Sequence, residues 1–322
     1  MAALTDPHVP TVVDLRHVRA SDLDGLLTEE TETWGTLLDW DFRPSASLVR
    51  RFLDMQALTG HTLLVGGRAV GYTYFVAEER KGLIGDLYVM EEFATPETES
   101  QLLGAVLVSM VKSPFIHRIE SQLMMLRNGS RITLPYWRFL KMHARNFLEL
   151  DLSKVPALPQ GPAARVVAID NWTERKQDEA AQLIATAYHG HIDSEINDQY
   201  RSPGGARRFL MNIVQYPGCG AFYQPASFIA VDPISGHLAG ICLSSLVADD
   251  VGHITQVCVS KAARHRGIGY ELLRRSLEAL ARSNCRRASL TVTAANKAAI
   301  RVYEQMGFTK RRDFSAYVWD GF

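Results

Sequence analysis

Residues 253–273 read HITQVCVSKAARHRGIGYELL, and this stretch decides the fold. Its first part is apolar and rich in β-branched residues, which predicts a strand, and its last part begins a series of leucines at helical spacing. Arg264, Gly267 and Gly269 lie between them and predict a tight turn that opens the helix. A helix N-terminus presents backbone N–H groups without intrahelical partners and a partial positive charge. Because glycine has no Cβ atom, this turn predicts a site for phosphate groups.

Two well-known glycine-rich phosphate motifs do not fit this turn. The dinucleotide-binding fingerprint needs a third glycine and an acidic residue at the end of the next strand. The strand expected over residues 288–293 leads instead to Asn296. The lysine of the P-loop is also missing. Taken alone, two glycines after a strand are equally compatible with a tight connection that binds nothing.

The sequence downstream of the turn separates these alternatives. The turn motif R-x-x-G-x-G is followed by N-x-x-A-x-x-x-Y, formed by Asn296, Ala299 and Tyr303, and then by Gly307-Phe308. In order and spacing, this series resembles the GNAT superfamily of acetyl-CoA-dependent N-acetyltransferases over roughly residues 165–322. The resemblance implies an α/β (α+β) fold, in which a mixed, mostly antiparallel twisted sheet is flanked by helices, and it implies acetyl-CoA as the cofactor.

The composition limits the class of protein and its partners. A chain of 322 residues is comfortable for two domains, and 47% hydrophobic with 22% charged residues is typical of a soluble globular protein. A formal net charge of zero gives no reason to expect a nucleic-acid partner. The first 160 residues carry 16 basic and 20 acidic side chains, and the rest carry 19 and 15, so the half with the glycine turn is the basic one. A polyanionic cofactor such as CoA favours that distribution.

The sequence contains no recognisable targeting segment and no cysteine motif. No early stretch reads as a signal peptide, and the longest apolar run is too short to span a bilayer, so we expect a cytoplasmic protein with no membrane partner. The four cysteines lack C-x-x-C spacing. They therefore predict free thiols and no metal site.

The second half of the sequence repeats the element order of the first half. Strands are expected over residues 12–18, 62–65, 70–77 and 83–89, and again over 165–169, 227–231, 238–247 and 254–259. Helices are expected over residues 21–27 and 48–58 in the first half, and over 173–188 and 194–214 in the second half, with an interruption near 203–205. Gly71 then falls on Gly240, and Val89 falls on Val259. One layout that occurs twice implies two copies of one fold. We expect two tandem GNAT folds, residues 1–153 and 165–322, joined by the proline-rich linker 154–164.

Only the second copy keeps the phosphate-binding turn. When Val89 is set on Val259, Ala94 stands for Arg264, Glu97 for Gly267 and Glu99 for Gly269. Two carboxylates would then lie where the pyrophosphate belongs, which opposes binding. We therefore predict that the first domain is degenerate and does not bind acetyl-CoA.

The resemblance also assigns residues to the cofactor. In GNAT enzymes the central strand is splayed from its neighbour, so its backbone pairs with the pantetheine amides, and a backbone N–H polarises the thioester carbonyl. These roles fall on Val257, Cys258 and Val259. The pyrophosphate falls on the turn and helix start formed by Arg264, His265, Arg266, Gly267, Ile268, Gly269 and Tyr270. Asn296 matches a CoA-contacting asparagine of the family, but it also precedes a helix and can serve as its N-cap.

Two catalytic residues are expected from the same comparison. Tyr303 stands where family members carry a tyrosine that protonates the CoA sulfur, and a phenol holds its proton at neutral pH. The competing interpretation is a buried core aromatic. His253 stands where the histone-acetylating branch carries its glutamate base, and an imidazole is able to accept an amine proton. A histidine with no catalytic role, Asp249 or Asp250, and a chain of waters remain alternatives for the base.

Substrate choice in this superfamily depends on the segment between the first two strands. Here that segment is rich in polar and aromatic side chains, which predicts a pocket wall for a small amine or a polar side chain: Tyr188, His191, Asp193, Asn197 and Tyr200. A metal site at His189, His191 and Asp193 is the alternative, but no further ligand spacing supports it. A solvated helix start is the third reading.

These observations lead to one expected function and two alternatives. We expect an N-acetyltransferase that moves an acetyl group from acetyl-CoA to a primary amine of a small molecule or peptide by direct attack, as a monomer or homodimer. The first alternative is a non-catalytic acyl-CoA-binding or sensing module. The second is a protein N-terminal or lysine acetyltransferase.

Overall fold

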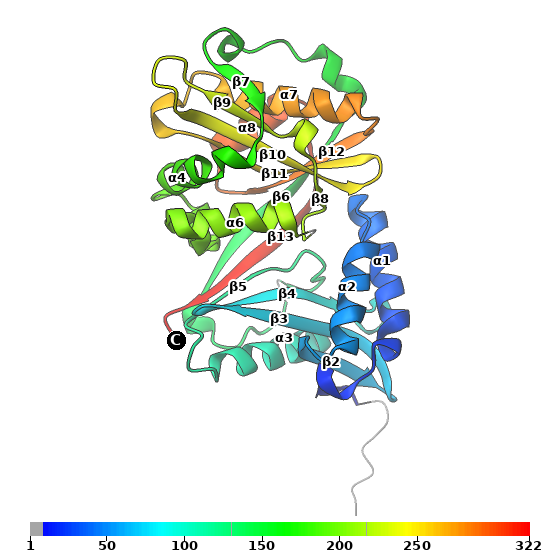
Figure 1. Cartoon of the computed structure of the whole chain (residues 1–322). Coiled ribbons are helices and arrows are strands. Elements are labelled where there is room, and N and C mark those ends of the chain that lie inside the picture. The colour runs from blue at the N-terminus through cyan, green and yellow to red at the C-terminus, as the bar shows by residue number, and fades with distance from the viewer. Residues whose placement is uncertain (1–8, 130, 217) are drawn as a thin grey trace, which may run out of the picture. The chain divides into compact units, whose positions relative to one another are not determined.

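The computed structural model describes residues 9–129, 131–216 and 218–322. The chain forms two compact units (Figure 1). The first unit is Met1–Ala144 with Phe314–Phe322, and the second unit is Arg145–Asp313. Each unit is a mixed α/β unit built on a sheet. In the described part of the chain, no helix combines the length and the apolar character that crossing a membrane requires.

The first unit holds a sheet of strand order β1-β2-β3-β4-β5-β13. Its elements are β1 (Thr11–Asp14), α1 (Asp24–Leu38), α2 (Arg43–Asp54), β2 (Thr59–Val65), β3 (Arg68–Glu78), β4 (Lys81–Val89), α3 (Pro96–Val111) and β5 (Arg118–Gln122). Neighbouring strands are antiparallel except for the parallel pair β4–β5. The strands predicted over 62–65, 70–77 and 83–89 are confirmed. The strand predicted over 12–18 ends at Asp14, where a 3₁₀ helix follows, and the helix predicted over 48–58 lies earlier in the sequence, as α2.

The second unit holds a sheet of strand order β6-β12-β11-β10-β9-β7, with β8 paired to β10. Its elements are β6 (Leu140–Asp151), β7 (Ala168–Asn171), α4 (Gln177–Tyr188), α5 (Asp193–Ile196), α6 (Pro203–Gln215), β8 (Ala221–Phe222), β9 (Phe228–Val231), β10 (Leu238–Ala248), β11 (Val251–Val259), α7 (Ile268–Arg282), β12 (Arg287–Thr293) and α8 (Lys297–Gln305). Strand β13 (Thr309–Asp320) follows, and from Phe314 on it belongs to the first unit. The pair β11–β12 is parallel, and the other pairs are antiparallel.

The two units share the same local geometry around the central strand. Gly71 of β3 lies opposite Val89 of β4, and Gly240 of β10 lies opposite Val259 of β11. Both antiparallel pairs contain a register shift three residues after this glycine, and the β10–β11 pair contains a second one between Leu246 and Ala248. The first residues of both central strands pair in parallel with the next strand. The repeated layout that the sequence predicts is therefore present twice.

The units do not divide at the proline-rich segment 154–164. Residues 145–151 of β6 pair with β12 in the second unit, and residues 316–320 of β13 pair with β5 in the first unit. Each sheet thus includes a strand from the other half of the sequence. The proline-rich segment lies inside the second unit, where the Tyr270 hydroxyl donates to the carbonyl oxygen of Pro159 (2.9 Å).

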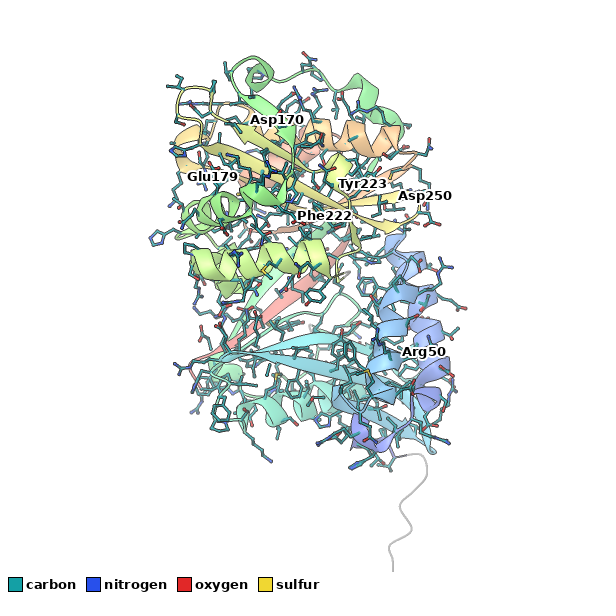
Figure 2. The ribbon with its side chains drawn as sticks, in the orientation of Figure 1. Arg50, Asp170, Glu179, Phe222, Tyr223 and Asp250 are labelled. Atoms are coloured by element: carbon teal, nitrogen blue, oxygen red, sulfur yellow. The ribbon has the colours of Figure 1, made fainter. Side chains whose placement is uncertain are left out.

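Helices cover both faces of the second sheet (Figure 1). The buried leucines of α7 pack on one face together with α8, as their helical spacing predicts: Leu272, Leu273, Leu277 and Leu280. Helices α4 and α6 pack on the other face. The Glu179 carboxylate of α4, labelled in Figure 2, accepts a hydrogen bond from the Leu238 backbone N–H (2.7 Å), which fixes α4 to the start of β10. The helical segment expected over 194–214, with an interruption near 203–205, consists of α5, a 3₁₀ turn and α6, and the interruption lies just before Pro203, where Ser202 caps a new helix.

The first unit contains a buried pair of carboxyl groups. Glu30 of α1 is completely buried and Asp86 of β4 is nearly so. Trp34 Nε1 donates to Glu30 Oε1 (3.3 Å), and the Leu87 N–H donates to Asp86 Oδ1 (2.8 Å). Burial, and next the charge of Asp86, raise the pKa of Glu30 well above its usual value, and burial raises the pKa of Asp86 to about 6.

This pair predicts a pH-dependent stability. The folded carboxyls hold protons that the unfolded chain releases, so the free energy of unfolding falls as the pH rises from about 4 through about 6. Glu30→Gln keeps a hydrogen-bonding group but cannot ionise. We expect this variant to melt at a higher temperature than wild type at pH 8, by about 2–4 °C for each kcal/mol gained. Thermal melts from pH 5 to 8 measure this, with the exposed Glu32→Gln as control. Equal pH slopes for Glu30→Gln and wild type would contradict it.

Candidate functional site

The central strand of the second unit has an open edge. Strand β11 pairs with β12 only over Val251–Ile254, and beyond that its described partner is β10 alone. The Ser260 N–H donates to the Ala239 carbonyl (2.8 Å), which sets the alternation of the antiparallel pair. By that alternation Cys258 exchanges its backbone hydrogen bonds with β10, whereas the backbone groups of Val257 and Val259 point toward the open edge. Of the three predicted strand residues, two thus present their backbone there.

The glycine turn leads from this edge into α7. Gly267 adopts a positive φ of 78°, which favours glycine, and α7 runs for 15 residues from Ile268 without a side-chain cap. In the described part of the chain, the N–H groups of Ile268, Gly269 and Tyr270 donate no backbone hydrogen bond outside the helix. A Cβ atom at Gly269 would meet only Val259 Cγ2, at 3.4 Å. The turn therefore ends in a row of available N–H donors that glycine leaves uncovered.

The charged residues of the turn divide into two kinds. Arg264 Nη2 donates to the Ala187 carbonyl (2.8 Å), so this guanidinium holds the end of α4. His265 and Arg266 are exposed. The start of α7 is fixed from the other side by the buried Glu271, whose carboxylate accepts from the Gly161 N–H (3.1 Å).

The Glu271 carboxylate also belongs to an ion pair inside α7. Arg274 Nη2 lies 2.7 Å from Glu271 Oε1. Burial opposes ionisation of Glu271, but the hydrogen bonds from Arg274 and Gly161 outweigh it and lower the pKa of the carboxyl. The helix start that carries the N–H donors is therefore rigidly held.

Helix α8 carries the predicted tyrosine. Asn296 Oδ1 accepts from the Ala299 N–H (3.2 Å) and caps the helix, so the N-cap interpretation of Asn296 is confirmed. Its amide Nδ2 lies 3.5 Å from His191 Nε2. The Tyr303 ring is buried and packs edge-on against Phe308, with 5.9 Å between the ring centroids. Burial raises the pKa of Tyr303, so the phenol keeps its proton at neutral pH.

Aromatic residues from the predicted substrate segment lie beside β11. Tyr188 and Tyr200 stack with 4.5 Å between ring centroids. The Tyr200 hydroxyl donates to Gln256 Oε1 (3.2 Å), and Gln256 Nε2 donates to the Tyr188 hydroxyl (2.9 Å). The Tyr188 hydroxyl in turn donates to the Val257 carbonyl (3.4 Å). This chain of hydrogen bonds ends on a backbone group of the open edge.

A second polar group spans from the same segment to β12. The Asp193 carboxylate accepts a hydrogen bond from the Thr293 hydroxyl and lies 3.5 Å from Arg145 Nη1. Arg145 also donates to the hydroxyls of Thr293 (2.9 Å) and Thr291 (3.0 Å). His191 Nδ1 accepts from the Asp193 N–H (3.2 Å). Through these contacts Asp193 is held at the end of β12, with His191 beside it.

Two predicted residues do not join this group. Asn197 Oδ1 accepts from the Gln199 N–H (3.0 Å) and caps a 3₁₀ helix. His253 is buried, its Nδ1 lies 2.9 Å from Ser289 Oγ, and its ring stacks on Phe147. Burial lowers the pKa of His253 to about 4. The structure therefore argues against the prediction that His253 is the general base, because its low pKa makes the ring a weak base and the core encloses it.

One alternative for the general base and three unpredicted residues can also be placed. Asp250, in the turn between β10 and β11 (Figure 2), forms an ion pair with Arg286. Arg145, Gln256 and Thr293 were not expected at the site. Gln256 directly precedes the predicted strand residues, and this position was the available signal. Arg145 lies far away in the sequence, in a strand assigned to the other half, so no local signal pointed to it.

The corresponding place in the first unit is filled by the chain itself. Helix α3 is capped by Thr95, whose hydroxyl accepts from the Thr98 N–H (3.2 Å). Glu99 is buried, and its carboxylate accepts from the N–H groups of Arg127 (2.9 Å) and Asn128 (2.8 Å). Residues 127–128 are thus held against the start of α3. The first unit has a capped helix and a buried carboxylate where the second has an uncapped glycine turn.

Comparison with known proteins agrees with this geometry. Residues 191–308 match the family model described as acetyltransferase (GNAT) family. Mycothiol acetyltransferase of Streptomyces griseus is 28% identical over 185 residues, which are 55% of this chain and 52% of that protein. The chain spans about half or less of the length of the curated relatives that it matches.

Solved structures show the same fold. A GCN5-related N-acetyltransferase from Sphaerobacter thermophilus has a TM-score of 0.68, at 17% identity over 98% of this chain and 96% of that one. A tandem GNAT protein from the clavulanic acid biosynthesis pathway has a TM-score of 0.61, at 15% identity over 98% and 99%. At these identities the likeness establishes the fold and nothing finer. The family match itself covers residues 191–308, and the structural likeness shows that the whole chain has the fold of these proteins, with two similar halves in tandem.

Proposed function

We propose that this protein transfers an acetyl group from acetyl-CoA to a primary amine of a small molecule or peptide, at the second unit. The observation that carries the proposal is the open edge of β11, which leads directly to the uncapped glycine turn of α7. The edge offers backbone groups to an extended amide chain, and the turn offers N–H donors to phosphates. Acetyl-CoA combines these two chemical features in one molecule.

The residues of the second unit fit acetyl-CoA, which supplies an acetyl group activated as a thioester. Val257 and Val259 would pair with its amide groups, and the N–H groups of Ile268, Gly269 and Tyr270 would hold its pyrophosphate. His265 and Arg266 are exposed beside those donors. Arg264 takes a revised role, since its guanidinium is engaged at the end of α4. Asn296 would contact the cofactor with its amide nitrogen, because its oxygen caps α8.

The same residues support direct transfer to an amine. A backbone N–H at the open edge would polarise the carbonyl that the amine attacks. Tyr303 would supply a proton to the departing sulfur, since burial raises the pKa of the phenol and the group is protonated at neutral pH. Tyr188, His191, Asp193 and Tyr200 would form the acceptor wall, where the Asp193 carboxylate attracts a positively charged amine. The likeness to a mycothiol acetyltransferase supports a small-molecule acceptor, and a peptide N-terminus or lysine is the alternative.

The first unit would not bind acetyl-CoA. Its equivalent helix start is occupied by Thr95, Glu99 and residues 127–128. A pyrophosphate would have to displace these contacts and approach a buried carboxylate, which Coulomb repulsion opposes.

Gly269→Glu tests the phosphate site by giving α7 the residue that α3 carries. The substitution has room, because only Val259 Cγ2 lies within 4 Å of the added Cβ. A carboxylate about 6 Å from a phosphate at an effective dielectric constant of about 20 weakens binding by about 2.8 kcal/mol, or about 100-fold. Isothermal titration with CoA measures the loss. Gly269→Gln, of equal size and no charge, is the matched control, and an unchanged affinity of Gly269→Glu would refute the site.

Tyr303→Phe separates an enzyme from a binding module. We expect turnover to fall by about 100-fold or more, because the sulfur loses its acid, while CoA affinity stays within about twofold. Release of free CoA thiol, followed across a panel of small amines and peptides, measures turnover. A wild-type protein that binds acetyl-CoA but releases no thiol with any acceptor would identify a binding module.

The stoichiometry of binding tests the assignment of the two units. We expect one CoA per chain, because Glu99 and residues 127–128 fill the first unit's site. Equilibrium titration of the full chain gives this number directly. Two equivalents of CoA per chain would show that the first unit also binds.

A further inference from the structure

We propose that His191 is the residue that accepts the proton of the acceptor amine, with Asp193 holding its ring in place. This inference rests on the proposed acetyl transfer and names a base that the sequence alone did not assign. The sequence placed His191 in the acceptor wall and His253 at the base. The structure makes His191 the better candidate for the base, because His253 is enclosed in the core and His191 is partly exposed beside the open edge.

The position of His191 is fixed from both sides of the opening between β11 and β12. Its ring lies edge-on to Tyr188, with 5.2 Å between centroids, and Tyr188 is hydrogen-bonded to the Val257 carbonyl. Its Nε2 lies 3.5 Å from the amide nitrogen of Asn296, at the start of the helix that carries Tyr303. The imidazole therefore stands between the strand that would hold the thioester and the helix that would supply the acid.

Asp193 gives this imidazole an ionic partner. Asp193 Oδ2 lies 3.6 Å from His191 Nδ1. The carboxylate is largely buried and is itself held by Arg145 and by the Thr293 hydroxyl. A carboxylate in this position orients the ring and offers a negative charge beside it.

The surroundings of the ring also bear on which nitrogen is free. Asp193 Oδ2 lies 3.6 Å from Nδ1, beyond hydrogen-bond distance but on the side where a proton on Nδ1 would face it, and the Asn296 amide nitrogen lies 3.5 Å from Nε2. These two contacts favour the tautomer with Nε2 unprotonated, whereas the Asp193 N–H, 3.2 Å from Nδ1, favours the other. The reacting form is the one with the lone pair on Nε2, toward the opening.

The proton balance of the step follows from these positions. As the neutral amine nitrogen forms its bond to the acyl carbon, His191 Nε2 takes one proton from that nitrogen. As the carbon–sulfur bond breaks and its electron pair remains on sulfur, Tyr303 gives the sulfur one proton. The imidazolium and the phenolate then return to their starting states by exchanging one proton through solvent. The products are an amide and a free thiol, and no oxidant or further reactant is needed.

His191→Gln is the central variant. We expect kcat to fall by about 100-fold or more, while the affinity for acetyl-CoA and the KM for the amine stay within about threefold. The acid limb of the pH profile of kcat/KM should disappear, and added imidazole should restore part of the activity. A purely structural role would change neither the pH profile nor the response to imidazole.

Two further variants and one spectrum complete the test. Asp193→Asn should lower kcat by about tenfold, and His189→Gln, at an exposed neighbouring position, should leave it unchanged. Nitrogen-15 spectra of wild-type protein should show His191 with its neutral proton on Nδ1. Wild-type activity and pH profile in a folded His191→Gln would overturn this inference alone, as would a ring that carries its neutral proton on Nε2 throughout. Absence of acetyl transfer by the wild-type protein to any amine would instead overturn the proposed function, and this inference with it.

Discussion

The whole site depends on the point at which β11 loses its neighbour. The parallel pair β11–β12 ends at Ile254, and a register shift against β10 follows directly. From there the strand keeps only one partner in the described residues, so its backbone groups at Val257 and Val259 have no strand to pair with. Buried or half-buried backbone groups require hydrogen bonds, and the proposed extended ligand would supply them with its amides. The roles proposed for the acceptor wall, the glycine turn and Tyr303 all assume a cofactor that lies along this open edge.

The two units differ at the place where the proposed ligand site lies. Both have the same central strand, the same register shift and the same parallel pair. They differ at the helix that follows. In the second unit the helix starts on glycine without a cap, and in the first unit Thr95 and Glu99 satisfy local N–H groups. Internal hydrogen bonds stabilise the first unit at the cost of the donors that a phosphate would use.

Features of the site that depend on residues close together in the sequence could be predicted, and features that depend on residues far apart could not. The strand, the turn and both following helices could be predicted because their signals are local: apolar alternation, two glycines, and leucines at helical spacing. The N-cap role of Asn296 was equally local. His253 was placed by its position in a motif, but its chemistry depends on Phe147 and Ser289, which come from other strands and bury it. Arg145 could not be predicted for the same reason, since only strand pairing brings it close to Asp193.

By itself, the sequence determined that the chain holds two copies of one α/β layout and that the second alone retains the glycine turn. These properties depend on residue order and on backbone conformations within a few residues of each other. Tertiary structure decided which strand completes which sheet and which histidine is accessible. It also decided that residues 127–128 fill the first unit's helix start. Strand pairing and burial join residues far apart in the chain, and their free energies depend on neighbours that no local pattern names.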